Sequence, residues 1–163
     1  MKLFNTQSIN VTKYLFFTGK GGVGKTSTAC ATAVALADGG KKVLLISTDP
    51  ASNLQDVFAT ELSSKGTPID EVKGLVVANL DPIRAAYEYK ESVIAPFRGK
   101  LPDSIITNME EQLSGFCTVE IAAFNEFSNF ITNKTIAEEY DHIIFDTAPT
   151  GHTLRMLQLP SAW

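Results

Sequence analysis

The sequence predicts an α/β fold in which a mostly parallel sheet carries helices on both faces. Three consecutive segments support this: an apolar run that stops at a glycine cluster, an alanine-rich stretch without Gly or Pro, and a second apolar run. They are Lys13–Thr18, Lys25–Asp38 and Val43–Ser47. The last is apolar on both faces, which is typical of a strand covered on both sides in a parallel sheet. Strand, helix and strand within about 35 residues make a βαβ unit, whose crossover we expect to be right-handed.

The rest of the chain predicts two more strands and a block of helices between them. The strands are Leu75–Leu80 and His142–Asp146. Asp81 followed by Pro82 is an N-cap with proline at the first helical position, so a helix is expected there. We expect a helical insertion over approximately residues 81–134, with helices from Pro82 to about Ile94, over Pro102–Leu113 and over Thr118–Ile131. The last carries an apolar stripe at helical spacing, formed by Ile121, Phe124, Phe127 and Ile131.

The predicted sheet is small for this class of fold. An open, doubly wound sheet usually has more than four strands. We therefore expect residues 1–163 to be the N-terminal part of one domain in a longer chain. Such a piece is incomplete at its C-terminus and exposes a sheet edge.

Composition excludes several classes of function. The formal net charge is −4, with 14 Lys+Arg against 18 Asp+Glu, whereas a broad nucleic-acid surface needs an excess of basic residues. Two cysteines are too few for a disulfide scaffold and suit a reducing cytoplasm. The apolar runs are far shorter than the ~18–20 residues that span a bilayer. We expect a cytoplasmic protein that does not insert into the membrane.

A glycine-rich motif joins the first predicted strand to the first helix. It satisfies G-x-x-x-x-G-K-[ST], in which glycines admit positive φ and let backbone N–H groups point at a phosphate. The helix N-terminus adds unpaired N–H groups and partial positive charge. A glycine-rich turn that only joins two elements is the alternative, but the full spacing and both flanks favour a phosphate loop. We expect a P-loop NTPase that binds ATP through Gly19, Lys20, Gly21, Gly22, Val23, Gly24, Lys25, Thr26 and Ser27.

Two aspartates follow predicted strands and complete the candidate site. Ligands of open α/β sheets sit beyond the carboxyl ends of the strands, so both should lie beside the phosphate loop. Asp146 fits the role of holding Mg²⁺ together with the Thr26 hydroxyl, while Lys25 reaches the β- and γ-phosphates. Asp49 is better placed to orient or deprotonate the attacking water. The alternative is that each aspartate only caps the turn that follows it.

The second lysine of the loop, Lys20, makes the motif GKGGVGKT. It resembles the deviant Walker A motif of dimeric ATPases that include MinD, ParA, nitrogenase iron protein and the arsenical-pump ATPases. The resemblance implies that Lys20 acts in trans, reaching the nucleotide bound by a facing ATPase unit as an arginine finger would. A solvated loop lysine is the alternative reading.

Four stretches narrow the resemblance further: GKGGVGKTS, STDPASNL, EQLSGFCTVEIAAFNEF and DTAPTGHTLRMLQLP. Together they resemble the N-terminal part of the arsenical pump-driving ATPase family, over about residues 13–163. The resemblance implies ATP hydrolysis with Mg²⁺, activated by As(III) or Sb(III), that drives an integral membrane arsenite permease. It also implies a second ATPase half or a homodimer partner. The protein would be cytoplasmic and peripheral at the membrane through the permease.

The family pattern also implies that Cys117 binds the metalloid and that His152 lies at or near that site. Trivalent arsenic is soft, and thiolate sulfur suits it. A lone cysteine at a helix start is otherwise a small buried apolar residue, and a lone loop histidine otherwise bonds the backbone. Cys30, among alanines, is assigned to core packing.

Two other functions remain open from the sequence. Tail-anchored-protein targeting ATPases share three of these stretches but would need a wide, Met-rich apolar groove, and the insertion has one methionine, Met109. The other alternative is a truncated piece that has no activity of its own.

Overall fold

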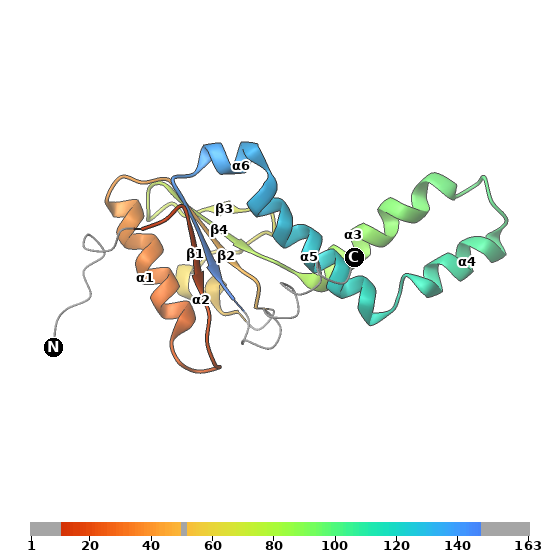
Figure 1. Ribbon diagram of the computed structural model, residues 1–163, viewed down its shortest axis with the longest axis horizontal. Coiled ribbons are helices and arrows are strands. Elements are labelled where there is room, and N and C mark those ends of the chain that lie inside the picture. Colours follow the sequence, from red (N-terminus) through yellow and green to blue (C-terminus); the bar gives the residue numbers. More distant parts are fainter. Residues whose placement is uncertain (1–10, 50–51, 148–163) are drawn as a thin grey trace. The chain divides into compact units, whose positions relative to one another are not determined.

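The computed structural model describes residues 11–49 and 52–147, without the side chains of Phe116 and Cys117. Strands and helices alternate in the first part of this chain, and five successive helical segments separate the last two strands (Figure 1). In order they are β1 (Tyr14–Phe17), α1 (Lys25–Asp38), β2 (Val43–Ser47), α2 (Leu54–Phe58), β3 (Thr67–Pro68), β4 (Leu75–Asn79), α3 (Pro82–Ile94), η2 (Ala95–Phe97), α4 (Asp103–Gln112), α5 (Phe116–Thr132), α6 (Lys134–Glu139) and β5 (His142–Asp146).

One five-stranded sheet organises the first of two compact units, which takes the chain up to Leu80 and again from Ile131. The strand order is β1-β5-β2-β4-β3, and only the β3–β4 pair is antiparallel. The predicted α/β fold with a mostly parallel sheet is therefore confirmed. Which strands pair was not predicted from the sequence. β5 lies between β1 and β2, so the two strands of the predicted βαβ unit do not pair with each other.

Besides the three-residue η2, three short elements were not predicted: α2, β3 and α6. They have five, two and six residues, which is too short for a 3.6- or 2-residue period to stand out from the sequence. β3 is an edge strand that contains Pro68, and proline within a sheet is confined to such positions.

The core of this unit lies between α1 and one face of the sheet. Alanines on α1 let the helix pack close to the strands, since Ala29 and Ala33 are fully buried. The facing side chains alternate along each strand, as a pleated sheet requires. They include Val43, Leu45, Leu75, Val77 and Ile144.

Glycine ends α1 by a specific backbone geometry. Gly40 adopts φ 81°, a left-handed conformation that is unfavourable for other residues. The N–H of Lys41 then donates to the carbonyl of Leu36 at 3.1 Å, which satisfies an orphan carbonyl of the last helical turn.

The second unit, Asp81–Phe130, is helical. Asp81 caps α3 as the sequence predicts, because its carboxylate accepts from the N–H groups of Ile83 and Arg84 at 3.0 and 3.1 Å. The Arg98 guanidinium contacts Glu91 of α3 and Glu110 of α4, each at 2.9 Å.

The most buried face of α5 differs from the predicted stripe. Phe127 is buried as expected, but Ala122 and Phe130 are the other deeply buried apolar side chains, and Ile121 and Phe124 are only half-buried. The stripe was inferred from apolar character alone, and nearly all sides of this helix carry apolar residues. Within residues 11–49 and 52–147, no helix has the length and apolarity needed to cross a membrane.

Replacing Leu45 tests the core. Leu45→Ala removes a fully buried side chain from β2, which has a neighbour on each side. It should lower the free energy of unfolding by about 2–5 kcal/mol through lost burial and the cavity left behind. Urea denaturation measures the change. Val57→Ala, at a side chain that is 52% exposed, is the control and should cost less than about 0.5 kcal/mol. Equal losses would contradict this description of the core.

Candidate functional site

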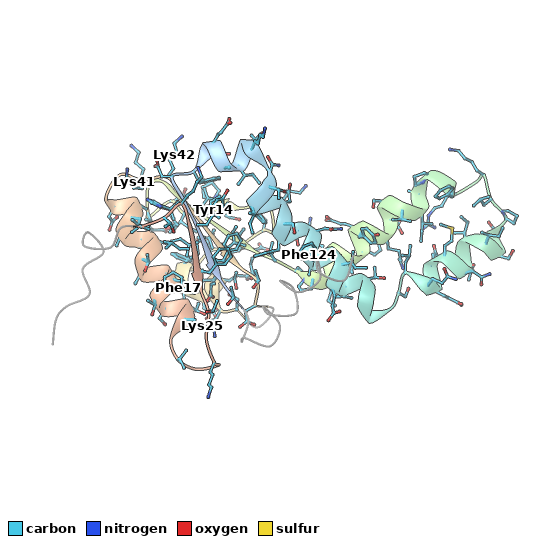
Figure 2. All side chains as sticks on the ribbon, in the orientation of Figure 1. Tyr14, Phe17, Lys25, Lys41, Lys42 and Phe124 are labelled. Carbon is cyan, nitrogen blue, oxygen red and sulfur yellow. The ribbon has the colours of Figure 1, made fainter. Side chains whose placement is uncertain are left out.

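The candidate site lies where the parallel strands end. β1 leads into the glycine loop, and Phe17, its last residue, is in register with Asp146 of β5. Asp146 is in turn in register with Ser47, the last residue of β2. Because β5 lies between β1 and β2, its final carboxylate adjoins both the loop and the segment after β2. Figure 2 shows Lys25 at this end of the sheet, and Lys41 and Lys42 at the opposite end.

The loop between β1 and α1 has a geometry that only glycine adopts easily. Gly22 and Gly24 have φ angles of 75° and 84°. A Cβ built at either position, or at Gly21, would meet no atom within 4 Å, so the backbone faces open space there. Gly24 caps the start of α1, where the helix presents unpaired N–H groups. This arrangement can hold an anion such as phosphate.

Two side chains from the first turn of α1 make contacts at this edge of the sheet. The Lys25 ammonium donates to the carbonyl of Lys20 at 3.2 Å, so it lies against the loop backbone. The Thr26 hydroxyl donates to Asp146 Oδ2 at 2.8 Å. Lys20 itself is exposed.

Asp146 is buried, and only one of its two oxygens is occupied. Asp146 as a whole is 1% exposed, and its Oδ1 has no hydrogen-bond partner among the described residues. Burial raises the pKa of this carboxyl above its usual range, the Thr26 hydrogen bond and Lys25 oppose the rise, and Asp49 adds to it. A buried carboxylate oxygen next to a threonine hydroxyl is a donor set that suits a hard cation such as Mg²⁺.

Asp49 lies two residues beyond β2, at the same edge. Its N–H donates to Ser47 Oγ at 3.2 Å, and its carbonyl accepts from the N–H of Ser52 at 2.9 Å. Its charge acts on the pKa of Asp146. The structure thus brings the phosphate loop, Thr26, Asp146 and Asp49 together.

Thr147, the residue after Asp146, ties this edge to β1. Its backbone N–H and its hydroxyl both donate to the carbonyl of Phe17, at 3.2 and 2.8 Å. The end of β5 is thereby fixed to the strand that leads into the phosphate loop.

The structure describes little of the two residues that the family resemblance assigns to the metalloid, Cys117 and His152. The backbone of Cys117 lies in the first turn of α5, but its side chain is outside the described set. His152 lies outside the described residues. Within the described part of the chain, no three His, Cys, Asp or Glu side chains group as a metal site.

Sequence reasoning missed two residues at the carboxyl edge, Ser47 and Asn79. Each is the last residue of its strand, as Asp146 is, and the three stand side by side in register. A signal was present, because a proline stands three residues after each of them. The segments read S-T-D-P, N-L-D-P and D-T-A-P.

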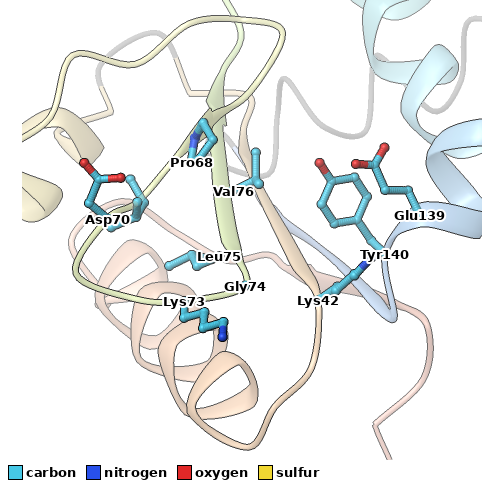
Figure 3. Close-up of a pocket in the computed structure, with 10 residues that line it drawn as sticks. Lys42, Pro68, Asp70, Lys73, Gly74, Leu75, Val76, Glu139 and Tyr140 are labelled. Carbon is cyan, nitrogen blue, oxygen red and sulfur yellow. The ribbon is translucent and has the colours of Figure 1, made fainter.

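A separate hollow of about 500 Å³ lies at the other end of the sheet (Figure 3). Its lining includes Lys42, Gly74 and Tyr140, which precede β2, β4 and β5. Lys73, Asp70 and Glu139 add charges of both signs. The hollow is therefore at the amino ends of the strands and is not part of the phosphate-loop site.

Removing the charge of Asp146 tests its buried state. The folded protein binds this proton more tightly than the unfolded chain does, so stability falls as pH rises from the ordinary aspartate value of 3.8 through the raised pKa. Asp146→Asn should remove that loss and so stabilise the nucleotide-free protein at neutral pH relative to the unsubstituted protein. Unfolding midpoints over a pH series measure the gain, which should disappear toward the ordinary aspartate value.

The control for this prediction is Asp70→Asn, which neutralises an exposed carboxylate outside the site. It should bring no such pH-dependent gain. Destabilisation by Asp146→Asn at neutral pH would contradict the reading of Asp146 as a carboxylate held at a cost in stability.

Comparison with known proteins gives a consistent result. Residues 12–163 match the family model described as Anion-transporting ATPase. The chain is 54% identical over 154 residues to an arsenical pump-driving ATPase from Acidiphilium multivorum, and equally to one from Escherichia coli. Each alignment covers 94% of this chain and 26% of the relative. It is also 38% identical over 160 residues to ATPase GET3 of Kluyveromyces lactis, covering 91% of this chain and 45% of that protein.

The chain thus spans about a quarter of the length of the pump-driving relatives. The family match covers the phosphate loop and both aspartates, together with all the elements of the sheet. On this evidence the chain belongs to the anion-transporting ATPase family.

Proposed function

We propose that this chain forms the nucleotide-binding part of an ATPase that is stimulated by arsenite or antimonite and drives an arsenite efflux permease. The observation that carries the proposal is the Thr26–Asp146 contact beside an open glycine loop. Family membership supports the ATPase reaction. The 54% identity to proteins named arsenical pump-driving ATPase supports the metalloid role. The protein would act in the cytoplasm, at the membrane through the permease.

The phosphates of ATP would lie on the loop of residues 19–27. Backbone N–H groups of the loop and of the first turn of α1 would neutralise them, as at other helix N-termini. The Lys25 ammonium donates to the Lys20 carbonyl in this structure. When ATP binds, it would donate to phosphate oxygens instead, because a charged acceptor makes the stronger hydrogen bond.

Thr26 and Asp146 would hold the metal that accompanies ATP. The fit rests on the buried Oδ1 of Asp146, which has no partner among the described residues, and on the adjacent hydroxyl. Mg²⁺, when bound, supplies positive charge that offsets the charge on the transferred phosphoryl group. Occupation of this site would also remove the cost of burying Asp146 in its charged form.

Asp49 would orient or deprotonate the attacking water. Its backbone is held by Ser47 and Ser52 at the same edge of the sheet as Asp146, which supports this role. A water held in line with the phosphate is already in the reactive geometry. This lowers the entropic part of the activation barrier.

Lys20 would act on the nucleotide of a second ATPase half or of a homodimer partner. Its exposed position in the loop supports this role, since a residue that acts in trans has to face outward. Lys20→Ala should then lower kcat by about 10³-fold while changing nucleotide affinity little, as for an arginine finger.

Steady-state hydrolysis and binding of a non-hydrolysable ATP analogue measure the two effects separately. Lys65→Ala, at an exposed lysine away from the site, is the matched control. Parallel losses of hydrolysis and of analogue binding in Lys20→Ala would count against action in trans.

Cys117 and His152 would form part of the site for As(III) or Sb(III). In this proposal the Cys117 thiolate is a soft ligand, and further ligands come from outside this chain. Binding would favour the closed pairing of two ATPase units by a coupling of about 1–3 kcal/mol, which stimulates hydrolysis.

Cys117→Ser should therefore bring the ratio of ATPase activity with and without arsenite down to one. The control is Cys30→Ala. Burial raises the pKa of the Cys30 thiol to about 11, which disfavours the thiolate, so this variant should keep the stimulation. Undiminished stimulation in Cys117→Ser would refute the metalloid assignment.

Targeting of tail-anchored proteins is the competing function. It would require a wide apolar groove in the helical unit, and Met109 is the one methionine of that unit. Capture of apolar C-terminal helices without any response to arsenite would favour targeting over the pump.

A further inference from the structure

A single peptide unit at the end of β5, the one that joins Asp146 to Thr147, is held from both neighbouring strands. Its carbonyl accepts from the N–H of Thr48, which follows β2, at 2.9 Å. Its N–H donates to the carbonyl of Phe17, the last residue of β1, at 3.2 Å. The residue assigned above to the metal therefore stands on a backbone that the two adjacent strands fix in place.

The side chain of Thr147 adds a further hydrogen bond at the same place. Its hydroxyl donates to the carbonyl of Phe17 at 2.8 Å, and the residue is 1% exposed. A carbonyl oxygen has two lone pairs, so it can accept from the N–H and from the hydroxyl at once. The main-chain bond alone would continue the ladder between β1 and β5. The hydroxyl is thus an addition to the sheet, and it acts where the sheet meets the site.

Phe17 is the point at which the chain leaves the sheet for the phosphate loop. It is the last residue of β1 in register with β5, and the glycines of the loop begin two residues later, at Gly19. Two donors on one carbonyl oppose rotation of the peptide that joins Phe17 to Thr18. That peptide sets the direction in which the loop starts, so the Thr147 hydroxyl holds the loop where it begins.

The position of the loop matters because the two proposed metal residues come from different elements. Thr26 belongs to α1, which the loop precedes, whereas Asp146 ends β5, and their side chains meet at 2.8 Å. Mg²⁺ requires near-octahedral geometry with oxygen ligands at about 2.0–2.1 Å. A small shift of the loop relative to β5 would therefore cost affinity for the metal. Thr147 links the two elements directly, because it follows Asp146 and bonds the strand that leads into the loop.

We infer that Thr147 is a positioning residue for the metal that accompanies the nucleotide. Its hydroxyl keeps the start of the phosphate loop, and with it Thr26, in a fixed position relative to Asp146. It acts through the backbone of Phe17 rather than by contact with the metal. This inference rests on the proposed function, because it needs Thr26 and Asp146 to hold that metal.

The test measures how far Mg²⁺ tightens the binding of a non-hydrolysable ATP analogue to the complete protein. The ratio of the dissociation constants in chelator and in Mg²⁺ should be roughly three- to tenfold smaller in Thr147→Val than in the unsubstituted protein, the effect of one lost hydrogen bond. Binding in chelator should stay within about twofold, because the loop N–H groups that meet the phosphates are unchanged.

Two further variants at the same position isolate the hydroxyl. Thr147→Ser keeps it and should restore the ratio. Thr147→Ala removes it without placing a methyl group against the Phe17 carbonyl, so it should match Thr147→Val and also serves if that variant does not fold.

Two variants elsewhere in the chain are the controls. Thr32→Val removes another buried threonine hydroxyl that donates to a backbone carbonyl at 2.8 Å, that of Thr28 within α1. It should leave the ratio unchanged. Asp146→Asn removes the carboxylate assigned to the metal and should lower the ratio more than Thr147→Val does.

The other outcomes overturn the inference in distinguishable ways. A wild-type ratio in Thr147→Val and Thr147→Ala, with the ratio lowered by Asp146→Asn, would overturn it and leave the proposed function standing. Equal weakening in chelator and in Mg²⁺ would show that the hydroxyl serves the loop as a whole and not the metal. A ratio in Thr147→Ser as low as in Thr147→Val would show that the hydroxyl does not set it. A ratio that Asp146→Asn leaves unchanged would overturn the proposed metal site as well.

Discussion

The register of the parallel strands is the constraint on which the site depends. Phe17, Asp146, Ser47 and Asn79 end adjacent strands in line, so loops from four parts of the chain leave the sheet at one edge. Side chains alternate along a strand, and a slip of one residue in β5 would turn Asp146 away from Thr26 and α1. The apolar row of Leu45, Val77 and Ile144 prevents that slip, because it would also leave the core.

The same arrangement explains why Asp146 is held in a charged form only at an electrostatic cost. α1 starts directly beside the last residue of β5, and this close packing buries Asp146 while providing only the Thr26 hydroxyl as a donor to it in the described residues. The raised pKa of Asp146 reflects this loss of solvation. A cation beside such a carboxylate offsets the cost of burying its charge, and this offset contributes to the affinity for the cation.

The sequence predicted what local patterns determine and missed what depends on pairing. The glycine loop, α1, the cap at Asp81 and the strands that end at Ser47 and Asp146 each have a local signal, and the structure has all of them. No local signal says that β5 enters between β1 and β2, because strand order is decided by packing across the whole sheet. Asn79 was missed for the same reason. A strand-ending asparagine becomes informative only when its register with Ser47 is known.

The two segments that follow Ser47 and Asp146 are anchored at their first residues. Asp49 is tied to β2 through Ser47 Oγ, and Thr147 is tied to the Phe17 carbonyl through both its N–H and its hydroxyl. Each anchor reaches a strand end rather than a neighbouring loop, so the first residue of each segment shares the rigidity of the sheet.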